Sequence, residues 1–446
     1  MKVTRYRVNE ENEPYNNAQS DFNTCDLFMQ NALPISQTSV FICLSLLLFL
    51  NLSCSKKGDG QILEVGQTIP ILFDPDIFPP LDSFISEITV IPLETNDDCL
   101  LRELLQGVKV HQDLIYINNM NRELYVFDMN GKFIREIGGI GQGPGEFLYL
   151  HDFIFTREGT IELLDYQKIE CYTLDGKYIE TKRFNTIRED LHCNANSFCR
   201  SFSSGYYLWG GMMDGGNPQR HEKANLLYRL NGDMQIEAGF FDTKFGDAGN
   251  IDRFKYYQDR ILFTLSSVDY NIYQIHPNDS LSIRYAFDFG KYGIKVDKND
   301  DKKTVLSVSK NYVNTVLGYH EADHFFYFSF RYKTLSFNLL YSKATGQSYI
   351  NSYWPAEKEE MRIYFADTIY KDQLLAIVQN SWLKMDLERM SPENIKKWGL
   401  EEFRKLDDED NPVLILYKTK FISETETEDL ISEMAKKSDK LYCSIS

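Results

Sequence analysis

A glycine-rich run, IGGIGQGPGEF at Ile137–Phe147, is the stretch whose residue types first suggest chemistry, because glycine-rich loops cradle phosphate groups. A dinucleotide-binding loop needs the spacing Gly-x-Gly-x-x-Gly, and a P-loop needs Lys and then Ser or Thr after its last glycine. Pro144 or Glu146 stands where the third glycine of the first motif would be, and Glu146 follows Gly145 where a P-loop has its lysine. Both spacings fail, so we expect no nucleotide ligand.

A connection between two strands is a better interpretation of the same run. The following segment, EFLYLHDFIF, has the aromatic character of a strand, whereas both phosphate motifs open a helix. Glycine supplies unusual backbone angles and proline stiffens the path, as a link between two strands requires. The backbone of this link is formed by Gly139, Gly141, Gly143, Pro144 and Gly145.

Two hypotheses for this loop stay open. It is either a purely structural crossover or a ligand-lining loop, because loops on a rigid scaffold frequently carry function. In the second case the candidate ligand-binding residues are Gln142, Glu146 and His151. His151 and Asp152 cannot both face one site on a regular strand, since neighbouring side chains point to opposite faces.

The other histidines, cysteines and serines show no complete catalytic or metal-binding pattern. His320 and His324 would share one face of a helix, but the segment HEADHFFYFSF lacks a following third ligand. The sequence contains neither a Cys-x-x-Cys pair nor a Gly-x-Ser-x-Gly elbow. We therefore expect no metal and no cofactor, and we assign no catalytic residue.

Aromatic residues before a second glycine-rich stretch have two interpretations. Tyr206, Tyr207 and Trp209 precede GGMMDGGN. Such rings form stacking platforms in sugar-binding clefts, but strands of a packed sheet need aromatic side chains as well. We favour packing in the core and keep the sugar platform as the alternative.

The composition describes an acidic chain that is rich in aromatic residues. The 446 residues are 43% hydrophobic and 14% aromatic, and the formal net charge is −17. Aromatic residues favour strands. A protein that neutralises nucleic-acid phosphates should show clustered Lys and Arg, and none appears, so we exclude nucleic acid as a partner.

The N-terminal region has the features of an export signal. Val40–Leu50 is an apolar run, too short to span a bilayer as a helix but suited to the core of a signal peptide. Cys54 follows the small residue Ser53 and resembles the lipidated cysteine of a bacterial lipoprotein. The absence of basic residues just before the run is explained if the true start is Met29. An uncleaved anchor is the alternative.

A hairpin recurs along the chain. Four segments that begin at Asn121, Gln167, Lys223 and Asp269 each contain a strand, a tight polar turn and a second strand. Asn-Gly or Asp-Gly in the first three predicts a two-residue turn with positive φ at both positions, and Asn278 takes this place in the fourth. A further pair of short strands precedes each hairpin.

Four strands in about 45 residues are typical of a β-propeller blade. We predict an all-β, six-bladed propeller with four-stranded blades over residues 86–421, closed by pairing of Ser86–Thr95 with the last blade. That blade carries a helical insertion, a helix over Ser391–Leu406 that follows a strand at Asp372–Trp382. The remaining predicted regions are a signal (1–53), a lipidated cysteine and linker (54–85) and a charged, helical C-terminal tail (422–446).

The sequence resembles the six-bladed β-propeller lipoproteins of Bacteroidetes, related in architecture to NHL-repeat and TolB-type propellers. The resemblance covers residues 62–420 and rests on the signal and on four motifs. These are VIPLET at Val90–Thr95, IGGIGQGPGEF at Ile137–Phe147, DYNIYQI at Asp269–Ile275 and YAFDFG at Tyr285–Gly290. It implies this fold and a location in the cell envelope, and it implies little about function.

Three functional hypotheses follow. The first is a non-catalytic binding or scaffold protein that is held to the membrane by lipid at Cys54 and binds a glycan, a peptide or an envelope protein at the mouth of the central channel. The second is a propeller hydrolase or lyase acting on glycans through polar residues in the channel. The third is a subunit of an envelope complex that docks through its helices. Lys56 and Lys57 favour the periplasmic side of the outer membrane over the cell surface.

Overall fold

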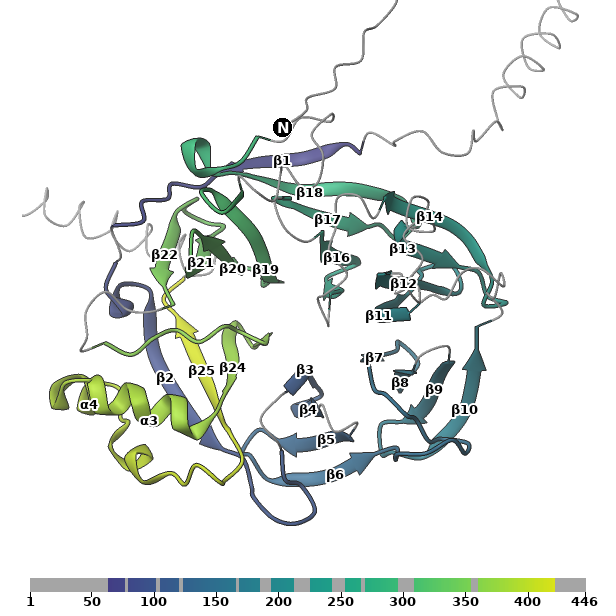
Figure 1. Cartoon of the computed structure of the whole chain (residues 1–446), viewed down its shortest axis with the longest axis horizontal. Helices are drawn as coiled ribbons and strands as arrows, with labels where there is room; N and C mark the ends of the chain where they lie inside the picture. Colours follow the sequence, from purple (N-terminus) through teal and green to yellow (C-terminus); the bar gives the residue numbers. More distant parts are fainter. Residues whose placement is uncertain are drawn as a thin grey trace, which may run out of the picture. The chain divides into compact units, whose positions relative to one another are not determined.

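The computed structural model describes residues 63–421 apart from 77–78, 102–104, 120–122, 166–167, 185–193, 212–224, 243–252, 266–268, 296–308 and 354–359. In this part of the chain six β-sheets surround a central axis (Figure 1), and each is one blade of a propeller. The predicted fold is confirmed. Cys54 and the predicted C-terminal helix lie outside the described residues.

The first three blades are each formed by strands that are consecutive in the chain. Blade 1 consists of β3 (Leu105–His111), β4 (Leu114–Asn119), β5 (Glu123–Asp128) and β6 (Phe133–Ile137). Blade 2 consists of β7 (Asp152–Phe155), β8 (Thr160–Asp165), β9 (Lys168–Thr173) and β10 (Tyr178–Arg183). Blade 3 consists of β11 (Asn194–Arg200), β12 (Tyr206–Gly211), β13 (Asn225–Leu230) and β14 (Ile236–Asp242).

Blades 4 and 6 each recruit one strand from the N-terminal region. Blade 4 consists of β15 (Lys255–Tyr257), β16 (Arg260–Thr264), β17 (Asn271–Ile275), β18 (Leu281–Asp288) and β1 (Val65–Pro70). Blade 5 consists of β19 (Val313–Glu321), β20 (Phe325–Tyr332), β21 (Leu335–Ser342) and β22 (Ser348–Ser352). Blade 6 consists of β23 (Thr368–Tyr370), β24 (Gln373–Val378), β25 (Val413–Thr419) and β2 (Ile85–Pro92).

The N-terminal region closes the ring as predicted and also extends blade 4. β2 pairs antiparallel with β25, for example Val90 with Ile415, so the N-terminal region supplies the outer strand of blade 6 and closes the ring. The sequence did not predict β1, which pairs in parallel with the outer strand β18. Its only buried residue is Ile69, so the sequence carries little of the alternation that would reveal a strand.

The repeated hairpins are confirmed, but their turn type differs from the prediction. In the first hairpin Gly131 has a positive φ (82°) and Asn130 does not, and the Gly131 amide donates to the Asp128 carbonyl at 3.0 Å. In the third and fourth hairpins Met234 (62°) and Asp279 (60°) take the same place, instead of the predicted glycine and asparagine. This is a three-residue loop with a bulge, which needs one left-handed residue where a two-residue turn needs two.

The helical insertion of blade 6 contains more helix than predicted. β24 ends at Val378, and α3 (Asn380–Arg389) begins where the sequence suggested continued strand. Leu383 and Leu387, four residues apart, give α3 one buried face, and this helical spacing was overlooked. The predicted helix after Ser391 is divided into α4 (Pro392–Lys397) and the 3₁₀ turn η5 (Glu401–Lys405). Ser391 caps α4, because its Oγ accepts from the Asn394 amide at 3.2 Å.

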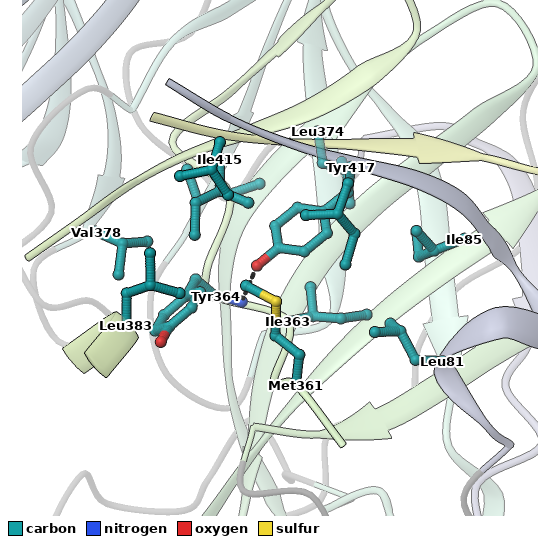
Figure 2. Packing of buried hydrophobic residues seen from close by; sticks show 14 of the residues in the cluster. Leu81, Ile85, Met361, Ile363, Tyr364, Leu374, Val378, Leu383, Ile415 and Tyr417 are labelled. Carbon is teal, nitrogen blue, oxygen red and sulfur yellow. Dashed lines mark hydrogen bonds between the residues drawn. The ribbon is translucent and has the colours of Figure 1, made fainter. Parts of the chain in front are cut away.

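The core of blade 6 joins regions that are distant in the chain (Figure 2). The N-terminal region packs with the middle strands β24 and β25 and with α3 in one cluster, including Leu81, Ile85, Leu374, Leu383, Ile415 and Tyr417. The Tyr417 hydroxyl accepts a hydrogen bond from the Tyr364 amide at 3.2 Å. Closure of the ring is therefore stabilised by packing as well as by strand pairing.

Two short 3₁₀ turns complete the described elements. The turn η1 (Leu81–Ser83) precedes β2, and η4 (Gly290–Tyr292) follows β18. No helix among the described residues is both long and apolar enough to span a bilayer.

Candidate functional site

Each sheet has its strand β3, β7, β11, β15, β19 or β23 at the edge nearest the central axis. These six inner strands surround a channel (Figure 1). Two cavities follow one another along it. A cavity of about 250 Å³ lies toward the starts of the inner strands and is bordered by Gly107 of β3 and Gly318 of β19. A cavity of about 430 Å³, here called the wide mouth, lies where β3, β7 and β19 end. Lys255 and His320 border both cavities, which makes the channel continuous.

Positive side chains line the wide mouth. They come from β3, from the turn after β7 and from the starts of β15 and β16, and they are Lys109, Arg157, Lys255 and Arg260. Glu321 is the one carboxylate among the residues that border this cavity. The border of this cavity is therefore basic in a chain whose net charge is −17, and Arg260 Nε lies 3.6 Å from the exposed Asp259 carboxylate beside it.

Glu321 does not neutralise these cations, because other basic groups already bind its carboxylate. Arg284 donates to it from Nε at 2.8 Å and from Nη2 at 2.6 Å, and Lys343 Nζ lies 2.7 Å away. The Tyr319 hydroxyl donates at 2.9 Å. These partners compensate the burial of the Glu321 side chain, which is inaccessible to solvent, so Glu321 is not available to neutralise the lysines and arginines that border the cavity.

Lys109 is held at the mouth by a second buried carboxylate. Its Nζ lies 2.7 Å from Asp152 Oδ1 and 4.8 Å from the centre of the Phe153 ring. Asp152 also accepts from the Ser197 hydroxyl at 2.5 Å and thereby connects the inner strands of blades 1, 2 and 3. Lys109 is thus positioned by an ion pair, with 17% of its side chain exposed.

Two histidines border the wide mouth. His320 is 5% exposed and borders both channel cavities. The ring of His111 stacks on Phe155, with centroids 4.2 Å apart, and burial lowers the pKa of His111 from its ordinary value of 6.5. His111 therefore adds no charge to the mouth near neutral pH.

The glycine-rich loop forms the predicted crossover from β6 to β7, at the end of the channel opposite the wide mouth. Glu146 turns back into the loop, and its Oε2 accepts from the Gly143 amide at 2.8 Å. A Cβ on Gly141 would lie 2.0 Å from the same oxygen, so a side chain there would displace the Glu146 carboxylate from the loop. Tyr172 donates to the Gly145 carbonyl, and Lys168 donates to the Glu146 carbonyl at 2.6 Å. The contacts of Glu146 are those of a brace within the loop.

The three ligand-binding candidates of this loop are not brought together at a cavity. Gln142 and Glu146 are exposed, and His151 is half-buried beside Tyr149, with ring centroids 6.2 Å apart. None of the three borders the channel cavities. Burial lowers the pKa of His151, against the opposing effect of Asp165 and Asp152.

The sequence analysis overlooked the basic residues of the wide mouth. Lys109 and His111 end β3, while Lys255 begins β15 and Arg260 begins β16. A search for basic residues at the end of each inner strand of the predicted repeat would have found the first pair. The convergence of residues from blades 1, 2, 4 and 5 needs the closed ring and has no local signal in the sequence.

Two other groups of residues can now be placed. Tyr206, Tyr207 and Trp209 are buried in β12, in agreement with packing in the core. HEADH has the His-Glu-x-x-His spacing of a zinc helix, but its residues form the end of β19 and the following turn, so the two histidines do not share a helix face. Over the described ranges no group of three or more His, Cys, Asp or Glu is suited to hold a metal ion.

Comparisons with known proteins agree with this architecture. A solved structure of a protein described as exported, from Bacteroides fragilis NCTC 9343, has 16% sequence identity and a TM-score of 0.61, and the match covers 79% of this chain and 99% of that one. A member of the DUF4221 family from Bacteroides vulgatus has 12% identity and a TM-score of 0.48 over 76% of this chain and 98% of that one. No curated protein matches the chain.

At these identities the first of the solved structures supports the fold alone. The sequence profile of a family described as a domain of unknown function, DUF4934, matches residues 79–418. This range begins just before η1 and ends within β25, so it includes the closing strand β2 and the four main strands of every blade but not the added strand β1. The chain therefore belongs to the DUF4934 family.

Proposed function

We propose that the protein is an exported, lipid-anchored β-propeller that binds an anionic ligand at the wide mouth of its channel and does not catalyse a reaction. The observation that carries this proposal is the excess of lysine and arginine around that cavity in an otherwise acidic chain. A cleft lined by one sign of charge concentrates ligands of the opposite sign, because its low-dielectric walls focus the field.

The dimensions and side chains of the wide mouth suit a small anionic group. A cavity of about 430 Å³ is within the usual range of ligand pockets. Arg157 and Arg260 offer planar forks of N–H donors that match a carboxylate, sulfate or phosphate group. Phe155 and Tyr256 add apolar and aromatic wall beside these donors.

The envelope location is part of the same proposal. Its support is the apolar run before Cys54 and the resemblance to lipoprotein signals. In cells, we expect Cys54→Ala to release the protein from the membrane fraction and globomycin to block its processing. Membrane attachment that persists in Cys54→Ala, together with processing insensitive to globomycin, would contradict lipidation at this residue.

Binding is tested with the full chain purified in detergent and titrated calorimetrically with glucuronate, glucose 6-sulfate and inorganic phosphate. The double variant Lys255→Glu/Arg260→Glu should lose at least tenfold in affinity for the anion that binds. The matched control Lys132→Glu/Lys177→Glu changes the net charge equally on the outer hairpins of blades 1 and 2 and should bind as the wild type does. Equal loss in both variants would reject the mouth as the site.

The same titration separates binding from catalysis. A hydrolase or lyase would consume a glycan substrate at the mouth and release new reducing ends or unsaturated sugars. We expect the bound ligand to be recovered unchanged after prolonged incubation. Turnover that is lost in Lys255→Glu/Arg260→Glu would replace the binding proposal with an enzymatic one.

A further inference from the structure

A third cavity, here called the side cleft, opens from the wide mouth toward the junction of blades 2 and 3. Its volume is about 460 Å³. It shares five bordering residues with the wide mouth, namely Phe155, Thr156, Arg157, Phe202 and Tyr256. Because the same five residues border both cavities, the two cavities lie next to each other.

The side cleft differs from the wide mouth in charge. Arg200 binds the buried carboxylate of Glu162 through Nε at 3.1 Å and Nη2 at 2.6 Å, and its Nη1 binds Glu158 at 2.9 Å. Lys182 Nζ lies 2.9 Å from Glu162 and 3.1 Å from the Tyr206 hydroxyl. Lys182 and Arg200 are thus balanced by Glu158 and Glu162, and the third cation that borders the cleft is Arg157, which also borders the wide mouth.

Aromatic side chains are among the residues that border both cavities. Tyr256, which borders both, is 52% exposed. The guanidinium of Arg157 lies 5.1 Å from the ring centre of Phe202, also within the shared wall. Aromatic faces beside hydroxyl, ammonium and guanidinium donors can hold a ring that has an apolar face and a rim of hydroxyl groups.

The backbone of the side cleft is poorly suited to an extended peptide. The turn after β11 forms one wall, and the Ser201 amide donates to the Gly205 carbonyl at 3.1 Å. The amides of Phe202 and Ser203 each donate to the Asp279 carboxylate at 3.1 Å. A peptide that adds a strand needs free main-chain donors, and these three are already used.

We propose that the ligand is an acidic oligosaccharide whose anionic sugar lies in the wide mouth and whose neighbouring neutral sugars lie in the side cleft. This inference rests on the proposed function, because the mouth supplies the charge recognition. The side cleft supplies hydrogen bonds and ring contacts, so affinity rises with the length of the glycan and not with additional charge.

The test compares three probes on the full chain in detergent: glucuronate, aldotetrauronic acid (one glucuronate on three xylose units) and xylotriose. We expect aldotetrauronic acid to bind at least tenfold more tightly than glucuronate and xylotriose to give no measurable binding. A tetrapeptide with one aspartate should bind no more tightly than glucuronate. Glucose 6-sulfate distinguishes a sulfated from a carboxylated sugar as the group in the mouth.

Ser204→Trp locates the neutral sugars. Ser204 is exposed and borders the side cleft but not the wide mouth. An indole at this position should fill the side cleft and reduce the affinity for aldotetrauronic acid to that for glucuronate. Ala344→Trp, an exposed substitution in the hairpin of blade 5, is the matched control and should bind as the wild type does. Thermal unfolding of both variants checks that each is folded.

The outcomes separate the two proposals. Binding of neither acidic sugar nor phosphate contradicts the proposed function itself. Binding of glucuronate or the sulfated sugar without any gain from the xylose units, or an unchanged gain in Ser204→Trp, rejects the side cleft as a glycan site while the anionic mouth stands. Tighter binding of the tetrapeptide than of aldotetrauronic acid would assign the site to an acidic peptide.

Discussion

Arg200 of blade 3 forms two hydrogen bonds to the Glu162 carboxylate of blade 2, at 3.1 and 2.6 Å, and Glu162 is completely buried. The junction of blades 4 and 5 repeats this arrangement, with Arg284 donating to Glu321 at 2.8 and 2.6 Å. A lysine completes each site. Such forked pairs fix the angle between neighbouring blades, because both hydrogen bonds must lie in the plane of the carboxylate.

Removing one arginine should destabilise the fold. Arg200→Ala leaves Glu162 buried with only Lys182 as a cationic partner, and the free energy of unfolding should fall by about 3 kcal/mol, as for other buried pairs that lose one member. Urea denaturation measures the change. Arg183→Ala, an exposed arginine of β10, is the control and should change it by less than about 0.5 kcal/mol. Equal effects of the two substitutions would contradict this role of Arg200.

The same pair should make stability depend on pH. Burial raises the pKa of Glu162, but the hydrogen bonds from Arg200 and Lys182 outweigh it, so the pKa lies below its ordinary value of 4.5. A carboxyl group whose pKa is depressed in the folded state contributes stability above its unfolded pKa, and this contribution is lost as pH falls through the folded value.

Denaturation measured between about pH 6 and pH 3 tests this expectation. The free energy of unfolding of the wild type should decrease below the ordinary carboxyl pKa, and Glu162→Gln should be less stable at pH 6 but less sensitive to acid. Glu180→Gln, which alters an exposed carboxylate near Lys182, should keep the wild-type dependence. An unchanged slope in Glu162→Gln would show that other groups determine acid sensitivity.

Phe73 should attach the segment after β1 to blade 5. Its ring lies 5.1 Å from Phe330 and from Phe337 and 5.4 Å from Tyr332, in edge-on contacts. Phe73→Ala should reduce the free energy of unfolding by about 3 to 5 kcal/mol, because a buried aromatic ring is lost and a cavity remains. The adjacent Leu72 is 89% exposed, so Leu72→Ala should have almost no effect. Similar losses in both variants would argue against specific packing of Phe73.

Most of the fold could be predicted because it is encoded by local, repeated patterns. Each hairpin is signalled within about 18 residues, and the segment Ser86–Thr95 was predicted as the closing strand, which β2 confirms. What the sequence missed depends on distant contacts. β1 has one buried residue, and Met234 adopts a left-handed backbone that residues of its type seldom show, so the ladder around them decides their conformation.

The candidate site was less predictable for the same reason. Lys109, Lys255 and Arg260 are separated by up to about 150 residues and become neighbours only when the ring closes. Each has an ordinary surface pattern in its own segment. The glycine-rich loop, by contrast, has a conspicuous local signal, and that signal is explained by a tight crossover: Gly141 leaves room for the Glu146 carboxylate.

The candidate residues of that loop give the last prediction. Glu146→Ala removes the acceptor of the Gly143 amide, which an exposed loop can partly replace with water, so the free energy of unfolding should fall by about 1 kcal/mol. Gln142→Ala should be neutral, since Gln142 is exposed. If the ligand lies at the wide mouth, both variants should bind the anionic probe with wild-type affinity, whereas Lys255→Glu/Arg260→Glu should not. A tenfold loss of affinity in Gln142→Ala or Glu146→Ala, with stability preserved, would restore the loop as a ligand site at the opposite end of the channel.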